Sequence, residues 1–345
     1  SFFVVCSCFF VVVSLLVLCL FLMEEKPLAI SLQDVQDAHE RIKSNINRTP
    51  VFTSRTLNEE AKQNLFFKAE NMQRTGSFKF RGATNSILQL DEEAAKKGVI
   101  THSSGNHGQA LALAAQVNGI KCYVVMPQGS PEIKKKAVAG YGGEIIYCSD
   151  DPQERERLAS KIAQEKKLTL IPSYDHPHIM AGQGTLMLEF YEQSGPLDYL
   201  IVPVGGGGLM SGVSVACKGV SPSTVIIGAE PILAGDAALS LKKGERQPPF
   251  STTRETVADG LRTGLGEYTF PVLQRNVTEI ITVSEEEIKK GMQLVWHYMK
   301  LVIEPSAGVG IAVALSPRFK EIAGENKKVG IVLCGGNLDL ESWKW

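Results

Sequence analysis

The sequence has no excess of charge of either sign, because 36 lysine and arginine residues stand against 37 acidic residues and the pI is near 6.6. Nucleic-acid-binding proteins usually carry a basic patch, so this balance gives no indication of a nucleic-acid partner. Internal repeats are absent, as are low-complexity tracts after residue 24, which excludes a repeat architecture. What remains is 345 residues, 44% of them hydrophobic, typical of a globular protein long enough for two domains.

Cysteines with the spacing of metal ligands are also absent. Of the seven cysteines, three lie in an apolar N-terminal stretch and four lie in or beside later apolar runs. We expect the later four to be reduced, buried side chains of a cytoplasmic protein. The first group is Cys6, Cys8 and Cys19, and the second is Cys122, Cys148, Cys217 and Cys334.

Residues 1–22 are almost wholly apolar, and about 20 such residues are long enough to cross a bilayer. The stretch has neither the basic start nor the small-residue cleavage site of a signal peptide. Met23-Glu24-Glu25-Lys26 then resembles the start of a water-soluble protein. We therefore expect residues 1–22 not to belong to the working protein, with membrane contact only if they are a genuine anchor.

From residue 65 onward, short apolar runs alternate with helical patterns, and a capping box at Ser31 and Asp34 begins an earlier helix that extends to Ile46. Such alternation predicts an α/β fold of mainly parallel sheets covered by helices on both faces. Nine strands are many for one compact sheet, so we expect two sheets with a cleft between them. The predicted strands are 65–68, 99–101, 122–126, 144–148, 168–171, 199–204, 225–229, 280–283 and 329–333.

Three polar or glycine-rich segments directly follow predicted strands, where open α/β sheets bind their ligands. Thr-His-Ser-Ser-Gly-Asn-His occupies residues 101–107, four glycines occupy 205–208, and Cys-Gly-Gly-Asn occupies 334–337. We expect these three segments to converge on one site.

Lys79 lies in the run Ser-Phe-Lys-Phe-Arg-Gly, and a lysine amine can hold an aldehyde as a Schiff base. The amine must lose its proton near neutral pH, and apolar surroundings such as Phe78 and Phe80 would favour the neutral form. The alternative is an ordinary surface lysine.

The four glycines at 205–208 join a strand to a helix, where each loses more backbone entropy on folding than other residues do. Close approach of the backbone N–H groups to a phosphate would explain them, and a flexible turn is the alternative. Neither a nucleotide-binding P-loop nor a dinucleotide fingerprint matches the spacing. An aldehyde and a phosphate on one small molecule describe pyridoxal phosphate.

Several motifs in order resemble those of the fold-type II pyridoxal-phosphate enzymes, in particular the family of serine racemases and serine/threonine dehydratases. They are SFKFRGA, THSSGNHGQAL, AGQGT, VPVGGGGL, GAEP, ADG, IEPSAGVG and GGN, and the resemblance extends from about Leu28 to Leu340. It implies a fold like that of the tryptophan synthase β subunit, with two open parallel-sheet domains and the cofactor in the cleft. The large domain would comprise residues 23–97 and 176–345, the small domain 98–175, and the active form would be a homodimer.

The resemblance implies that Lys79 carries the cofactor and that Ser104 is a second acid/base on the opposite face. The expected activity is interconversion of L- and D-serine, with β-elimination of serine to pyruvate and ammonia. The expected cofactor-binding residues are Lys79, Asn106, Gly205, Gly206, Gly207, Gly208, Leu209 and Cys334, and the expected substrate-binding residues are Ser103, Ser104, Gly105 and His107.

Two alternatives to a racemase remain open. Dehydratases commonly have alanine at the position of Ser104, which favours a racemase. Cys334 replaces the usual serine of racemases, however, and a neutral thiol cannot keep the pyridine ring protonated as a carboxylate would. This favours a serine/threonine ammonia-lyase with little racemase activity. The second alternative is a pyridoxal-phosphate-binding protein without turnover, tethered to a membrane by residues 1–22.

The resemblance also implies two further sites. Oxygen ligands from Glu230, the carbonyl of Ala234 and Asp236 would hold Mg²⁺, Ca²⁺ or Mn²⁺, and two solvated carboxylates are the alternative. ATP would bind as an effector at the dimer interface, although Arg55, Thr56 and Arg74 differ from the residues of mammalian members. The expected ATP contacts are Ser54, Arg55, Thr56, Arg74, Thr75, Gln109, Tyr141, Lys300 and Asn337.

Overall fold

The computed structural model describes residues 27–103, 105–130, 132–341 and 343. Two features singled out in the sequence, the apolar stretch 1–22 and Ser104, lie outside the described residues. Within these residues, no helix combines the length and the apolar character that a membrane crossing requires.

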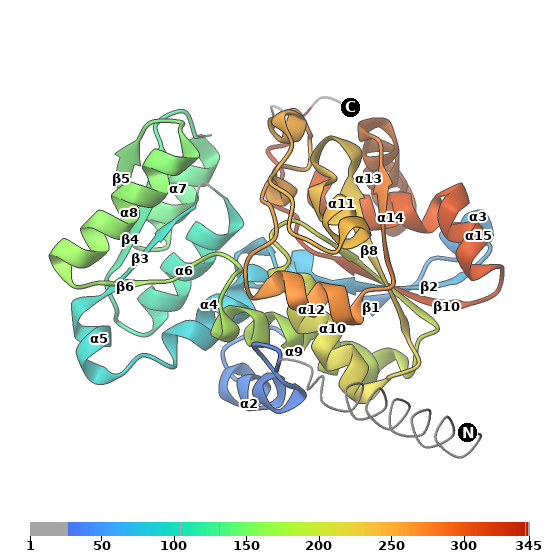
Figure 1. Ribbon diagram of the computed structural model, residues 1–345, viewed down its shortest axis with the longest axis horizontal. Helices are drawn as coiled ribbons and strands as arrows, with labels where there is room; N and C mark the ends of the chain where they lie inside the picture. The colour runs from blue at the N-terminus through green and yellow to red at the C-terminus, as the bar shows by residue number, and fades with distance from the viewer. Residues whose placement is uncertain (1–26, 104, 131, 342, 344–345) are drawn as a thin grey trace, which may run out of the picture.

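The described strands form two sheets (Figure 1), as predicted. One sheet has the order β1-β2-β10-β7-β8-β9 and the other the order β5-β4-β3-β6. Every neighbouring pair is parallel except β1 with β2. The strands are β1 (Val51–Phe52), β2 (Asn64–Ala69), β3 (Val99–His102), β4 (Cys122–Pro127), β5 (Gly143–Cys148), β6 (Thr169–Leu170), β7 (Tyr199–Pro203), β8 (Val225–Pro231), β9 (Glu279–Val283) and β10 (Lys328–Leu333).

All nine predicted strands are present, and among the described strands β1 alone was not predicted. This strand has two residues and pairs antiparallel with β2 at the edge of its sheet. Two apolar residues are too few to show the alternation by which a strand is predicted. The four-stranded sheet lies within residues 98–175, and the exact domain boundaries stay a prediction.

Helices cover both faces of the six-stranded sheet (Figure 1), as expected for parallel strands. The capping box at Ser31 is present, and the helix that it begins, α2 (Leu32–Ile42), is four residues shorter than predicted. The other α-helices are α3 (Arg55–Ala61), α4 (Lys79–Ile87), α5 (Glu92–Lys97), α6 (Asn106–Val117), α7 (Glu132–Gly140), α8 (Pro152–Lys166), α9 (Pro177–Ser194), α10 (Gly208–Val220), α11 (Asp236–Lys243), α12 (Thr269–Asn276), α13 (Glu285–Met299), α14 (Pro305–Leu315) and α15 (Pro317–Ala323). Short 3₁₀ helices are η1 (Glu70–Met72), η2 (Arg74–Gly76), η3 (Ile232–Ala234), η4 (Ser251–Arg254) and η5 (Asp259–Leu261).

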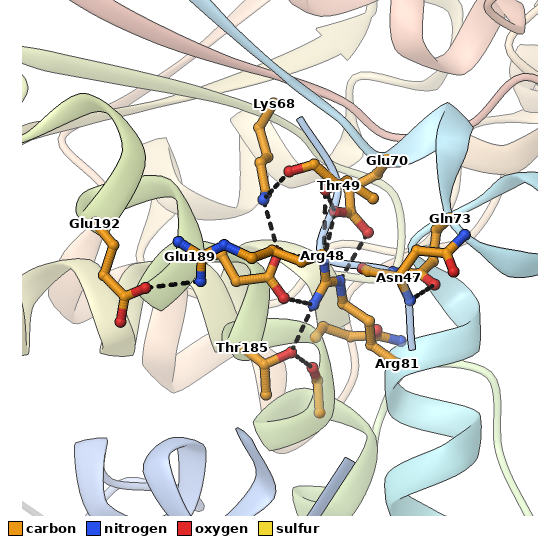
Figure 2. A network of polar contacts seen from close by, with 12 residues as sticks. Asn47, Arg48, Thr49, Lys68, Glu70, Gln73, Arg81, Thr185, Glu189 and Glu192 are labelled. Atoms are coloured by element: carbon orange, nitrogen blue, oxygen red, sulfur yellow. Dashed lines mark hydrogen bonds and ion pairs between the residues drawn. The ribbon is translucent and has the colours of Figure 1, made fainter. Parts of the chain in front are cut away.

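A buried cluster of two positive and two negative side chains joins α4 and α9 to β2 and η1 (Figure 2). The Arg81 guanidinium donates to both oxygens of Glu70, each at 2.8 Å, and to both oxygens of Glu189, at 2.7 and 2.9 Å. Lys68 Nζ donates to Glu189 at 2.7 Å, and all four side chains are 2% exposed or less. Burying four charges is costly unless each is paired. Because Arg81 follows Lys79 by two residues, this cluster fixes the helix that begins with Lys79.

Candidate active site

The three segments predicted to converge do so. β7 and β10 are parallel neighbours, so the glycines at 205–208 and the segment 334–337 leave the sheet at the same edge. The segment after β3, in the other sheet, reaches this edge through Asn106, whose Oδ1 accepts a hydrogen bond from Asn337 Nδ2 at 2.8 Å. The start of α4 joins the same edge, because Phe78 N–H donates to the Cys334 carbonyl at 3.1 Å.

Lys79 lies at the first position of α4, and its Nζ donates to the carbonyl of Ser173 at 2.6 Å. Burial lowers the pKa of the Lys79 amine from 10.5 to about 8; Cys334 and Glu304 would oppose this shift only in their ionised forms. The Phe78 ring lies 5.2 Å from Nζ, as the sequence suggested. Phe80 does not contribute in this way, because its ring packs against Arg74 instead.

The glycines at 205–208 form a loop whose positions leave no room for a side chain. A Cβ atom at Gly206 or Gly208 would lie 2.5 or 2.8 Å from Tyr174, and one at Gly207 would lie 2.8 Å from Thr269. Gly207 has φ +86° and caps α10, a helix of 13 residues. Among the described residues, the four glycine amides have no hydrogen-bond acceptor. Unpaired N–H groups at a helix N-terminus fit a phosphate.

A polar network crosses the site at Asn106. Its Nδ2 donates to both oxygens of Glu304, at 2.9 and 3.0 Å, while Asn337 Nδ2 donates to Asn106 Oδ1 and to the Thr75 carbonyl. Burial, followed by repulsion from Asp259, raises the pKa of the Glu304 carboxyl to about 7. Sequence reasoning assigned no role to Glu304, although the motif IEPSAGVG contains it. The expected contact of Asn106 with a cofactor oxygen stays a prediction.

Two buried side chains of the site carry no charge near neutral pH. Burial and the nearby Glu304 raise the pKa of the Cys334 thiol well above its ordinary value, so the thiol is neutral, as the sequence suggested. Burial and the charge of Lys79 lower the pKa of His107 to about 3. Because the Ile171 carbonyl 3.2 Å from His107 Nε2 can only accept, Nε2 carries the hydrogen. His107 Nδ1 is then a buried acceptor without a partner in the described part of the chain.

The remaining predicted cofactor and substrate residues adjoin this region. Leu209, in the first turn of α10, is buried. Ser103 Oγ accepts from the Gly105 amide at 3.3 Å, and a Cβ at Gly105 would meet nothing within 4 Å. There is therefore open space beside Gly105. Ser104 is not among the described residues.

The two carboxylates predicted to bind a metal are buried beside each other at the end of β8 and the start of α11. Glu230 accepts from the amides of Ala237 and Ala238, at 3.0 and 2.9 Å. Asp236 Oδ2 is buried and has no protein partner among the described residues. Burial raises the pKa of Asp236 to about 6 and that of Glu230 well above its ordinary value. An unpaired buried oxygen of this kind fits a bound cation.

The predicted effector residues are brought together only in part. Thr75 and Asn337 are hydrogen-bonded to each other at 2.8 Å. Arg74 donates to the Asn45 carbonyl at 2.9 Å, Arg55 is exposed beside Glu59, and Lys300 donates to the His297 carbonyl. ATP binding stays a prediction.

Comparison with known proteins assigns the family. The family model described as "Pyridoxal-phosphate dependent enzyme" matches residues 42–335. The chain belongs to this family of pyridoxal-phosphate dependent enzymes. This membership accords with the buried amine of Lys79 and the unpaired amides of the glycine loop, which would hold the aldehyde and the phosphate of one cofactor.

Individual relatives narrow the class further. The chain is 46% identical to a serine racemase of Dictyostelium discoideum over 318 residues, covering 92% of this chain and 98% of that protein. It is also 46% identical to an L-threo-3-hydroxyaspartate ammonia-lyase of Saccharomyces cerevisiae, covering 90% and 94%. The crystal structure of the Dictyostelium racemase superposes with a TM-score of 0.86 over 90% of this chain and 100% of that one. The predicted fold class and the resemblance to serine racemases and ammonia-lyases are confirmed.

The pKa of Lys79 leads to a first prediction. A neutral amine reacts with an aldehyde and a protonated amine does not, so the lowered pKa places the onset of reactivity near pH 8 instead of 10.5. We expect the rate at which the cofactor-free protein condenses with pyridoxal phosphate to rise with pH and to reach half its plateau near pH 8. Stopped-flow absorbance measures this rate. A midpoint that coincides with that of a simple alkylamine would contradict the assigned pKa.

Proposed function

We propose that this protein is a pyridoxal-phosphate dependent serine racemase that interconverts L- and D-serine and also eliminates serine to pyruvate and ammonia. The observation that carries the proposal is the buried Lys79 amine, with a pKa of about 8, which is linked through the consecutive residues Ser173 and Tyr174 to a glycine loop with unpaired amides. The names of its relatives support serine as the substrate.

When bound, pyridoxal phosphate supplies an aldehyde and an electron-withdrawing ring that make the α-hydrogen of an amino acid acidic. Three features of the site fit this group: the buried amine of Lys79, the glycine loop at 205–208, and the buried neutral thiol of Cys334. Lys79 would hold the aldehyde, and the glycine amides would hold the phosphate. Asn106, fixed by Glu304 and Asn337, would lie at the ring.

Lys79 would also move the α-proton on one face of the substrate. An amine whose pKa lies near the working pH can both accept and donate a proton, which is the requirement for a reversible acid/base. Inversion needs a second group on the opposite face, because one group that returns its own proton restores the original configuration. Ser104 is that group in this proposal.

The ammonia-lyase alternative has one specific observation in its favour. Cys334 is a neutral thiol, and a thiol is a weak hydrogen-bond donor that cannot keep the ring nitrogen protonated. Loss of the serine hydroxyl, which gives pyruvate and ammonia, would then compete well with return of the proton. The relative from Saccharomyces cerevisiae carries the name of an ammonia-lyase.

One incubation separates the two reactions. The full chain is supplied with pyridoxal phosphate and L-serine, and D-serine and pyruvate are measured together. The proposal expects both products. Pyruvate without D-serine would show that the protein is an ammonia-lyase. If neither product formed, both functions would be refuted.

A divalent cation, Mg²⁺, Ca²⁺ or Mn²⁺, would bind Glu230, Asp236 and the Ala234 carbonyl. Without it, ionisation of the buried Asp236 is disfavoured, so stability is lost as pH rises from 3.8 to about 6. We therefore expect added Mg²⁺ or Mn²⁺ to raise the melting temperature, and to do so more above pH 6 than below it. Differential scanning fluorimetry measures the shift.

The matched variants for the cation are Asp236→Asn and Asp37→Asn. The first removes the ligand charge and should abolish the shift with Mg²⁺ or Mn²⁺, whereas the second changes an exposed helix residue and should retain it. An equal shift in all three proteins would show that the ions act elsewhere.

The active form would be a homodimer. Met72, Trp296, Tyr298 and Val302 expose large apolar surface, and Asn71 donates to the Val302 carbonyl at 3.1 Å, which places Met72 and Val302 close together. Apolar surface of this kind is typical of a protein interface. ATP would bind as an effector at this interface. A cytoplasmic location is supported by the four free buried cysteines.

A further inference from the structure

Three consecutive residues, 173–175, connect the four-stranded sheet to α9 and reach several parts of the site. The Ser173 carbonyl accepts the hydrogen bond from Lys79 Nζ at 2.6 Å. Tyr174 packs directly on the glycine loop, with its ring at Gly206 and its Cβ at Gly208. Sequence reasoning passed over this segment, because Tyr-Asp-His-Pro has the composition of an ordinary turn.

Asp175, the third residue, binds the start of α12. Its Oδ2 accepts from the amide of Glu267 at 2.8 Å, and its Oδ1 accepts from those of Tyr268 and Thr269 at 2.9 and 3.1 Å. A carboxylate at a helix N-terminus is favoured by the helix dipole as well as by these hydrogen bonds. A Cβ atom at Gly266 would lie 2.1 Å from Asp175 Cγ, so the carboxylate lies tightly against this turn.

Thr269 connects the turn held by Asp175 to the glycine loop through hydrogen bonds. Its Oγ1 accepts from the Gly266 amide at 2.8 Å and donates to the Gly206 carbonyl at 2.8 Å. The side chain is fully buried, and its Cβ lies against Gly207. In a trans peptide the C=O and the following N–H point in opposite directions. Holding the Gly206 carbonyl toward Thr269 therefore directs the Gly207 N–H away from it.

We infer that Asp175 is a positioning residue for the phosphate of the cofactor: it fixes Thr269, and Thr269 fixes the direction of the glycine amides. The inference rests on the proposed binding of pyridoxal phosphate. It assigns a role in the cofactor site to a residue that touches neither the glycines nor Lys79. Ser173 contacts the Lys79 amine and Tyr174 contacts the glycine loop. With Asp175 in this role, one short segment positions both the amine and the glycine loop.

The test compares two aldehydes, pyridoxal phosphate and pyridoxal, which differ only in the phosphate. Both are titrated into cofactor-free wild type and Asp175→Ala, with absorbance as the readout. A charged hydrogen-bond network of this kind predicts a dissociation constant for pyridoxal phosphate raised about tenfold in Asp175→Ala. Binding of pyridoxal should stay unchanged, because it does not use the glycine amides.

Asp198→Ala is the matched control, since Asp198 Oδ2 likewise accepts a backbone amide, that of Lys328 at 2.8 Å, but at the opposite end of β7. A second pair of variants tests the intermediate step. Thr269→Val keeps the shape of the side chain, loses the donor to Gly206 and should behave like Asp175→Ala. Thr269→Ser keeps the hydroxyl and should behave like wild type.

Each outcome separates the inference from the proposed function. If wild type fails to bind pyridoxal phosphate, the proposed function falls. If wild type binds it and Asp175→Ala binds it equally well, the function stands and the inference is wrong. An equal loss for pyridoxal and its phosphate would also overturn the inference, because the substitution would then act on Lys79 or on folding.

Discussion

Replacement of Lys79 by alanine is expected to lower both D-serine and pyruvate formation by roughly 10³-fold or more. In the proposed function the same amine holds the cofactor and moves the α-proton, so its removal would affect both products. The visible absorbance band of the covalently attached cofactor should disappear. Steady-state rates and an absorbance spectrum measure these effects.

The loss should not come from unfolding. Among the described residues, Lys79 Nζ makes one hydrogen bond, to the Ser173 carbonyl, and burial disfavours its charge. The melting temperature of cofactor-free Lys79→Ala should therefore match that of the wild type without cofactor. Lys96→Ala, at an exposed position of helix α5, is the matched control and should retain activity. An absorbance band that persists in Lys79→Ala would mean that another lysine holds the cofactor.

Replacement of Ser104 by alanine is expected to lower D-serine formation from L-serine by about 10²-fold or more while pyruvate formation survives. Elimination needs proton removal on one face only, which is the role proposed for Lys79. Inversion needs both faces. Chiral chromatography and a pyruvate assay on the same reaction give the two rates.

The ratio of the two rates is the informative quantity, since a general loss of folding would lower both. Ser44→Ala, at an exposed position just after α2, serves as the control and should leave the ratio unchanged. Equal D-serine formation by wild type and Ser104→Ala would refute the role of Ser104.

Much of the fold follows from local patterns in the sequence. Alternating apolar runs and helical patterns predicted nine strands and two sheets, because parallel strands buried on both faces are strongly apolar. β1 was missed because two residues carry too little pattern. The buried cluster around Arg81 could not be predicted, since charged residues are mostly exposed and only tertiary contacts pair this one with Glu70 and Glu189.

The candidate site likewise has parts that the sequence predicts and parts that depend on tertiary contacts. The convergence of residues 101–107, 205–208 and 334–337 was predictable, because each of these segments directly follows a strand of a mainly parallel sheet. The contact of Glu304 with Asn106 was not predictable, because Glu304 lies just before α14 and the two residues are 198 positions apart in the sequence. Asp175 was missed for a related reason, since its amide partners lie more than 90 positions later in the chain.

The most direct test of the account is to trap the bond between protein and cofactor. The full chain is loaded with pyridoxal phosphate, reduced with borohydride, digested and mapped by mass spectrometry. The account predicts a phosphopyridoxyl group on the peptide that contains Lys79. A label on a different lysine, or no label on any peptide, would contradict it.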